Sequence, residues 1–105
     1  MKAITVQELK QWREEGKEHQ LIDVRESHEI DICCIDGDHI PMGEILEKTN
    51  SIRKDVPVVV HCRSGQRSGS VVISLERNYG FDNLYNLSGG ILAWADEIDN
   101  SLETY

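Results

Sequence analysis

The chain has 105 residues, with 11 Lys and Arg against 19 Asp and Glu, and a formal net charge of −8. This length predicts a single domain over residues 1–105. The acidic balance argues against nucleic acids or membranes as partners, because both attract basic surfaces. No apolar run approaches the length of a membrane span, and residues 1–5 lack the apolar core of a signal peptide, so we expect a cytoplasmic protein.

The first forty residues alternate between helical and strand-like patterns. Thr5 and Glu8 have the spacing of a capping box, and the apolar residues that follow share one helical face until Gly16. Three further elements are predicted here, namely a strand over residues 20–24, a helical turn over 26–30 and a strand over 32–35. Residues 36–38 then predict a turn.

The rest of the chain continues this alternation. Residues 57–61 contain the clearest strand, because their run of valines is typical of a parallel strand buried on both faces. The other predicted elements are an extended segment over residues 39–41, a helix over 42–49, a helix from Ser68 that ends at Gly80, a strand over 84–87, a turn at Gly89 and Gly90, and a helix over 91–98. Strands that alternate with helices predict an α/β fold with three layers, in which helices cover both faces of a mostly parallel central sheet.

The three cysteines differ in their surroundings. Cys33 and Cys34 are adjacent and cannot bridge each other without strain, so reduced thiols are expected. We expect one of them to pack inward and the other to face a neighbouring layer, and a role in resolving or accepting sulfur stays open. With His28 and His39 they show no spacing that predicts a metal site, and no motif implies a cofactor. Cys62 lies in a polar, glycine-containing loop, which is the setting of a nucleophile.

Cys62 follows the most buried predicted strand and precedes a predicted helix. The backbone N–H groups of such a loop, together with the positive end of the helix dipole, stabilise an anion and so lower the pKa of a thiol. Arg63 and Arg67 add positive charge that can hold an oxyanion donor beside the sulfur. Ser64 supplies a hydroxyl, and Gly65 permits the positive φ of a tight loop.

Four neighbouring residues are expected to support this loop: Asp23, Arg25, His61 and Ser68. Asp23 and Arg25 lie at the end of a neighbouring strand, and we expect them to brace loops through hydrogen bonds or an ion pair, with direct substrate contact as the alternative. His61 is expected to pack at the end of its strand or to hydrogen-bond the loop, with tuning of Cys62 as the alternative.

Four segments resemble motifs of one family, in the family's order and across nearly the whole chain. Residues 61–68 (HCRSGQRS) resemble the active-site loop of the rhodanese sulfurtransferases, and residues 21–25 (LIDVR) resemble their Asp-Val-Arg element. Residues 37–43 (GDHIPMG) resemble the family's Gly-His-Ile-Pro-Gly-Ala segment with insertions, and residues 87–94 (LSGGILAW) are similar to its Leu-x-Gly-Gly-x-x-x-Trp signature. The chain is thus similar to a single-domain rhodanese.

This resemblance implies an enzyme that needs no cofactor. Cys62 would attack the outer sulfur of a donor such as thiosulfate or a persulfide, and cyanide or a thiol would then remove that sulfur from the resulting cysteine persulfide. Residues 63–67, Gln66 included, would bind the donor. The implied partners are a small sulfur donor and a thiol acceptor, which can be a thiol of another protein.

Two alternative functions stay open. The first is a sulfur-relay or interaction module, in which Cys62 carries sulfur between protein partners. The second and more remote one is a cysteine phosphatase or an arsenate reductase. Phosphatases related to this fold place one more residue between Cys and Arg, whereas only residues 63–66 separate Cys62 from Arg67 here. By that analogy the shorter loop suits a sulfur atom rather than phosphate.

The net charge is unevenly distributed along the chain. Residues 61–75 contain two basic residues and no acidic one, whereas residues 23–47 contain eight acidic residues and one basic residue. We therefore expect a positive loop in a negative body, with a modest and salt-dependent affinity for anionic donors. The same field favours a protein acceptor with a basic face.

Overall fold

A sheet of five parallel strands forms the centre of the computed structural model, which describes residues 1–105. The strands are β1 (Lys2–Ile4), β2 (Gln20–Asp23), β3 (Asp38–His39), β4 (Val58–His61) and β5 (Leu84–Leu87). Their order across the sheet is β1-β5-β4-β2-β3, and every neighbouring pair is parallel. The predicted α/β class is therefore confirmed, with a sheet that is parallel throughout.

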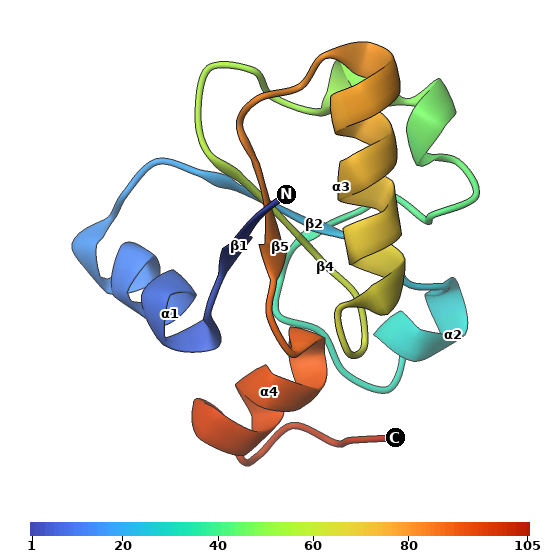
Figure 1. Ribbon diagram of the computed structural model, residues 1–105. Coiled ribbons are helices and arrows are strands. Elements are labelled where there is room, and N and C mark those ends of the chain that lie inside the picture. Colours follow the sequence, from blue (N-terminus) through green and yellow to red (C-terminus); the bar gives the residue numbers. More distant parts are fainter.

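Helices cover both faces of this sheet, as Figure 1 shows. Leu21 and Val59 belong to the hydrophobic cluster on one face, together with apolar residues of α1 (Val6–Glu15) and α4 (Gly90–Glu97). Their sequence neighbours Ile22 and Val60 point to the opposite face, where they share a cluster with α3 (Gln66–Tyr79). Because successive residues of a strand alternate between faces, β2 and β4 contribute to both cores, and the predicted three layers are confirmed.

The predicted helix ends match the structure closely. The Thr5 hydroxyl accepts from the backbone N–H of Glu8 at 3.1 Å, while the Thr5 N–H donates to the Glu8 carboxylate at 3.2 Å, which completes the capping box of α1. Gly16 ends this helix at φ 67°, and Gly80 ends α3 at φ 71°. None of the helices is long and apolar enough to span a membrane.

The strand predicted over residues 32–35 is wrong. A short helix, α2 (Ser27–Ile30), occupies the predicted helical turn, and a turn and loop follow it. The carbonyl of Cys33 accepts a hydrogen bond from Arg25 at 2.8 Å, and the carbonyl of Ile35 accepts one from Arg13. Arginine side chains thus take backbone acceptors that a strand would have given to a neighbouring strand.

Two other elements differ from the prediction. The helix predicted over residues 42–49 is replaced by two 3₁₀ turns, η1 (Ile45–Glu47) and η2 (Thr49–Ser51), with a break at Lys48 at φ −120° and ψ 31°. Strand β1 was not predicted, because three residues are too short for a pattern to identify. It pairs with β5, and its Ile4 is buried in the core.

The carboxyl ends of β2 and β4 bring the candidate site together. These two strands are hydrogen-bonded neighbours, with Asp23 beside His61 in the register. The predicted nucleophile Cys62 comes directly after β4, and Arg25 lies two residues after β2. Because the strands are parallel, both segments leave the sheet at the same edge.

Candidate active site

Cys62 begins a tight loop between β4 and α3, and its side chain is almost fully buried, with 1% exposure. The loop turns back so that its donors point at the sulfur. The backbone N–H groups of Gly65 and Ser68 lie 3.1 and 3.4 Å from Sγ, and the Ser68 hydroxyl lies 3.3 Å from it. Gly65 adopts φ 106°, a conformation that side-chain-bearing residues rarely reach, so the turn requires glycine.

These donors govern the acidity of the thiol. Burial raises the pKa of Cys62, but hydrogen bonds from the Ser68 hydroxyl and from the N–H groups of Ser68, Gly65 and Ser64 outweigh burial, so the pKa lies below its ordinary value. The first turn of α3 carries no acidic residue that would oppose this. The loop therefore favours a thiolate at Cys62, which is the nucleophilic form of cysteine.

Asn86 of β5 controls the hydroxyl of Ser68. The Asn86 side chain donates through Nδ2 to the carbonyl of Gly65 at 3.1 Å, so its Oδ1 faces Ser68 and accepts from the hydroxyl at 2.6 Å. A hydroxyl has one proton, and Ser68 gives it either to Asn86 or to the sulfur of Cys62. The backbone N–H groups are free of this competition.

The start of α4 is tied to the same loop. The N–H groups of Ile91 and Leu92 donate to the carbonyls of Cys62 and Arg63 at 3.0 and 3.1 Å. Gly90 has φ 59°, and a Cβ at this position would lie 2.5 Å from the carbonyl oxygen of Arg63 and 2.7 Å from that of Cys62. The contact between α4 and the loop therefore requires a residue without a side chain.

Asp23 and Arg25 form a buried ion pair at the end of β2. Arg25 is 0% exposed, and its Nη2 lies 2.8 Å from Oδ2 of Asp23. The guanidinium also donates to the carbonyls of Glu29 and Cys33 at 3.3 and 2.8 Å, which links β2 to α2 and to the loop after it. Burial lowers the pKa of Arg25, but hydrogen bonds with Asp23 and Tyr105 raise it above its ordinary value.

His61 lies in the scaffold beneath the loop. Its side chain is 0% exposed, with Nδ1 3.3 Å from the carbonyl oxygen of Cys62 and Nε2 3.4 Å from Oδ2 of Asp23. Nε2 makes no hydrogen bond. Burial lowers the pKa of His61 more than the nearby Asp23 raises it, so the ring is neutral near pH 7.

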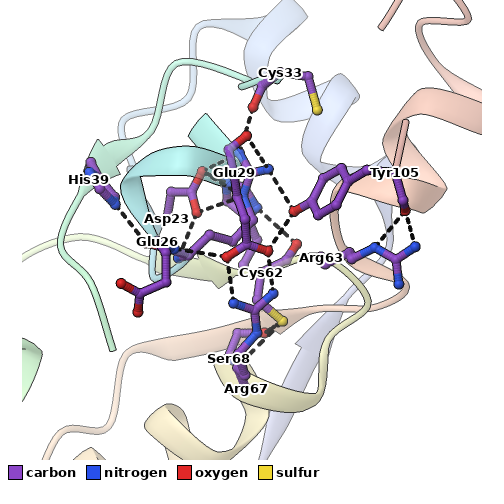
Figure 2. Close-up of polar contacts among 12 residues, drawn as sticks. Asp23, Glu26, Glu29, Cys33, His39, Cys62, Arg63, Arg67, Ser68 and Tyr105 are labelled. Atoms are coloured by element: carbon purple, nitrogen blue, oxygen red, sulfur yellow. Dashed lines mark hydrogen bonds and ion pairs between the residues drawn. The ribbon is translucent and has the colours of Figure 1, made fainter. Parts of the chain in front are cut away.

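Both predicted cationic residues have partners within the protein, as Figure 2 shows. Arg67 donates through Nη1 and Nη2 to the two carboxylate oxygens of Glu29, at 2.7 and 2.8 Å. Arg63 donates through Nε to the carbonyl oxygen of Tyr105 at 2.7 Å, and its guanidinium lies 5.0 Å from the centroid of the Tyr105 ring. The residues predicted to hold an anion are therefore held by Glu29 and Tyr105.

Tyr105 connects several charged groups around the loop. Its hydroxyl donates to Glu29 at 2.8 Å and accepts from Nη1 of Arg25 at 3.0 Å. The C-terminal segment thereby lies beside the loop after β4 and the helix after β2 at once (Figure 2). A single aromatic side chain thus joins the buried ion pair of Arg25 to the more exposed arginines.

The side chains of the other predicted residues make none of these contacts. Ser64 and Gln66 are exposed on the outer side of the loop. Cys33 is half-buried against the core on the α1 and α4 face, as expected for one of the two cysteines, and both are free thiols. The expectation that the other faces a neighbouring layer is wrong, because Cys34 is exposed. No three His, Cys, Asp or Glu side chains form a group that could hold a metal ion.

Three residues of the site were not predicted: Glu29, Asn86 and Tyr105. Asn86 had a recognisable signal, because it is a polar side chain at a buried position of a short apolar strand. Glu29 lies on the predicted helical turn, and only its distant partner Arg67 reveals its role. Tyr105 has no local signal, since its contacts depend entirely on the path of the C-terminal segment.

Comparison with known proteins agrees with this geometry. The model of the Rhodanese-like domain matches residues 5–97. The Bacillus subtilis protein named "Putative sulfurtransferase YtwF" is 41% identical over 98 residues, covering 92% of this chain and 93% of that protein. "Probable adenylyltransferase/sulfurtransferase MoeZ" of Mycobacterium tuberculosis is 32% identical over 98% of this chain, which spans only 27% of the length of MoeZ.

Solved structures give the same result. The crystal structure of a rhodanese-like domain protein from Staphylococcus aureus superposes with a TM-score of 0.84 and 37% identity, covering 100% of this chain and 99% of that one. These similarities extend over the loop, both neighbouring strands and the helices that hold them. The chain belongs to the rhodanese-like domain family.

Proposed function

We propose that this protein is a sulfurtransferase in which Cys62 carries a sulfane sulfur from a donor to a thiol acceptor. The family and its relatives named as sulfurtransferases support sulfur transfer in general. The observation that carries the proposal is the convergence of the Gly65 and Ser68 N–H groups on Sγ of Cys62, at 3.1 and 3.4 Å. Hydrogen-bond donors that stabilise a thiolate also stabilise the anion of a persulfide, since both anions carry their negative charge on sulfur.

The reaction proceeds in two displacements at sulfur. The Cys62 thiolate attacks the outer sulfur of the donor, the bond between this sulfur and the rest of the donor breaks, and the leaving group departs with the electron pair. Cys62 then carries a persulfide, whose terminal sulfur is attacked by the thiolate of the acceptor. The Cys62 thiolate is released for the next cycle. Neither step requires a general base when the thiolate is already formed.

The loop residues have distinct parts in this proposal. Gly65 and Ser68 hold the charged sulfur through their N–H groups, and Ser64 adds a further N–H toward it. Arg67 forms an ion pair with Glu29, and Arg63 donates to the carbonyl oxygen of Tyr105, so both arginines are held by partners within the protein. Gln66 is exposed at the start of α3, and we propose that it contacts the donor.

Replacement of the nucleophile tests the proposal. The Cys62→Ser variant should lose sulfur transfer to cyanide, measured as thiocyanate, and intact mass should show no added sulfur. The matched control is Cys34→Ser, which removes an exposed thiol and should retain both properties. Wild-type activity in Cys62→Ser, or sulfur gained at Cys34 instead, would contradict the proposal.

A sulfur relay between proteins is the second candidate function. It is favoured by MoeZ, where the matching region is 27% of a longer protein whose name combines adenylyl transfer and sulfur transfer. A relay predicts that Cys62 gains one sulfur from a protein persulfide even where turnover with thiosulfate is weak, and intact mass distinguishes these outcomes. A phosphatase is less favoured, because Arg67, the residue that would hold phosphate, is paired with Glu29.

A further inference from the structure

The guanidinium of Arg67, a cationic group of the loop after β4, is paired with the carboxylate of Glu29. Both carboxylate oxygens of Glu29 are used by Arg67, at 2.7 and 2.8 Å, and Glu29 is 6% exposed. The same carboxylate accepts from the hydroxyl of Tyr105 at 2.8 Å and from the backbone N–H of Glu26 at 2.9 Å. With four donors around it, Glu29 is fixed in place, and Arg67 is held as one half of a bidentate pair.

Glu29 stays charged under all ordinary conditions. The hydrogen bonds from Arg67, with further ones from Glu26 and Tyr105, outweigh the effect of burial and lower the pKa of Glu29 to about 2. Arg67 is therefore neutralised as a pair rather than presented as a free cation. Arg63 keeps its charge, and its guanidinium is held by the carbonyl oxygen and the ring of Tyr105.

Sulfur donors differ in where they carry their negative charge. In thiosulfate the sulfonate group carries much of the charge and leaves as sulfite, a dianion that needs cationic partners outside the loop. In a persulfide of a thiol, R–S–S⁻, the charge lies on the sulfur that is transferred. The N–H groups of Gly65 and Ser68, which point at Sγ of Cys62, are suited to stabilise negative charge on sulfur. The acidic residues between 23 and 47 add a field that opposes a dianion.

We propose that Glu29 is a specificity-determining residue that selects thiol-borne persulfides over thiosulfate as sulfur donors, because it holds Arg67 in an ion pair. The inference rests on the proposed sulfur transfer through Cys62. In the step concerned, the Cys62 thiolate attacks the outer sulfur of R–S–S⁻, and the bond between the two donor sulfurs breaks. The thiolate R–S⁻ leaves with the electron pair, so sulfur and charge are conserved.

The Glu29→Gln variant tests this selection. Glutamine has nearly the same shape, but it no longer neutralises Arg67, and its single oxygen can replace only one of the two carboxylate oxygens that accept from Glu26 and Tyr105. The formation of persulfide on Cys62 is followed by intact mass with thiosulfate and with cysteine persulfide. We expect loading from thiosulfate to rise about tenfold, the effect of releasing one charge-assisted interaction, while loading from cysteine persulfide changes less than about twofold.

The matched control is Asp31→Asn. It removes an exposed carboxylate two residues beyond Glu29 and changes the net charge equally, so it should leave the ratio of the two loading rates unchanged. Albumin carrying a persulfide on its free cysteine is a second persulfide donor. Loading from either persulfide ahead of thiosulfate supports the inference, and the albumin arm shows whether the source can be a protein.

Two outcomes would overturn the inference. One is a wild-type protein that loads from thiosulfate as fast as from cysteine persulfide, and the other is a Glu29→Gln variant that gains equally with both donors. If no donor places sulfur on Cys62, the proposed function itself fails. Should Glu29→Gln not fold, the inference is tested on the wild-type protein with sulfate as a competing dianion. Loading of Cys62 is then measured in sulfate and in sodium chloride at equal ionic strength. Sulfate should leave loading from cysteine persulfide unchanged, and specific inhibition would show an arginine open to dianions.

Discussion

The segments at the ends of β4 and β2 lie at the same edge of the sheet but stabilise charge differently, the first with neutral hydrogen-bond donors and the second with an ion pair. After β4, the sulfur of Cys62 is surrounded by N–H and O–H donors of Gly65 and Ser68 that carry no charge of their own. At the end of β2, the charges of Asp23 and Arg25 are buried against each other. A loop of neutral hydrogen-bond donors can stabilise a charge that appears during a reaction. The charges of a closed ion pair are already satisfied by each other and stabilise no further charge. The first segment therefore suits chemistry, and the second suits support and selection.

The largest effect is expected from breaking the buried pair. Arg25→Met leaves the carboxylate of Asp23 buried without its main partner, since both side chains are no more than 2% exposed. We expect the free energy of unfolding to fall by about 3–5 kcal/mol, measured by urea denaturation. The matched control is Arg53→Met, which removes an arginine with two carboxylate partners from an exposed position and should have little effect. Equal losses of unfolding free energy in the two variants would contradict the comparison, because burial would then not increase the cost of breaking an ion pair.

The next largest effect is expected at the contact between the start of α4 and the loop after β4. Gly90→Ala places a Cβ within 2.5 Å of the carbonyl oxygen of Arg63, so the loop or α4 must move. We expect a loss of about 2–4 kcal/mol in unfolding free energy, from the left-handed backbone and the collision together, and slower alkylation of Cys62. Gly80→Ala is the control, because Gly80 has a similar φ of 71° but open space around it.

Gly80→Ala should lower stability by only about 1–2 kcal/mol and leave the alkylation of Cys62 unchanged. If both variants lose the same stability and neither affects Cys62, the close approach of α4 does not position the loop. The position of Cys62 would then depend only on the hydrogen bonds within the segment after β4.

Local features of the site could be predicted from the sequence, and distant contacts could not. Cys62 and Gly65 belong to one strand-loop-helix unit, whose chemistry follows from neighbouring residues. The partners of Arg67 and Arg63, by contrast, lie 38 and 42 residues away in the chain. Their positions depend on how α2 and the C-terminal segment pack, and no short pattern describes this. The sequence therefore identifies the two arginines as cationic residues of the loop but not the partners that hold them.

The fold shows the same division. Valines of β4 and the caps of α1 and α3 are local signals, and these elements were predicted within a few residues. The apolar residues at 32–35 also resemble a strand, but their backbone acceptors are taken by Arg25 and Arg13 from other elements. β1 depends on its pairing with β5 at the far end of the chain. Tertiary contacts override or create local structure at these two places.

The smallest expected effect is the most informative about the loop. Ser68→Ala removes a hydroxyl 3.3 Å from Sγ of Cys62, and with it one donor to the thiolate. Loss of such a donor disfavours the charged form, so the pKa of Cys62 should rise and its reaction with iodoacetamide at neutral pH should slow about tenfold. The rate should recover as the pH increases, because the thiolate forms at higher pH. Ser70→Ala, an exposed site on the same helix, is the control and should leave the pH profile unchanged.

The competition for the Ser68 proton makes either result decisive. Oδ1 of Asn86 lies closer to the hydroxyl than the sulfur does, at 2.6 Å against 3.3 Å. A profile that moves to higher pH means that the thiolate draws this proton away from Asn86. A profile that stays in place would contradict the prediction, because the proton would then remain with Asn86. In that case the N–H groups of Gly65 and Ser68 hold the thiolate unaided, and the segment after β4 stabilises charge with its backbone alone.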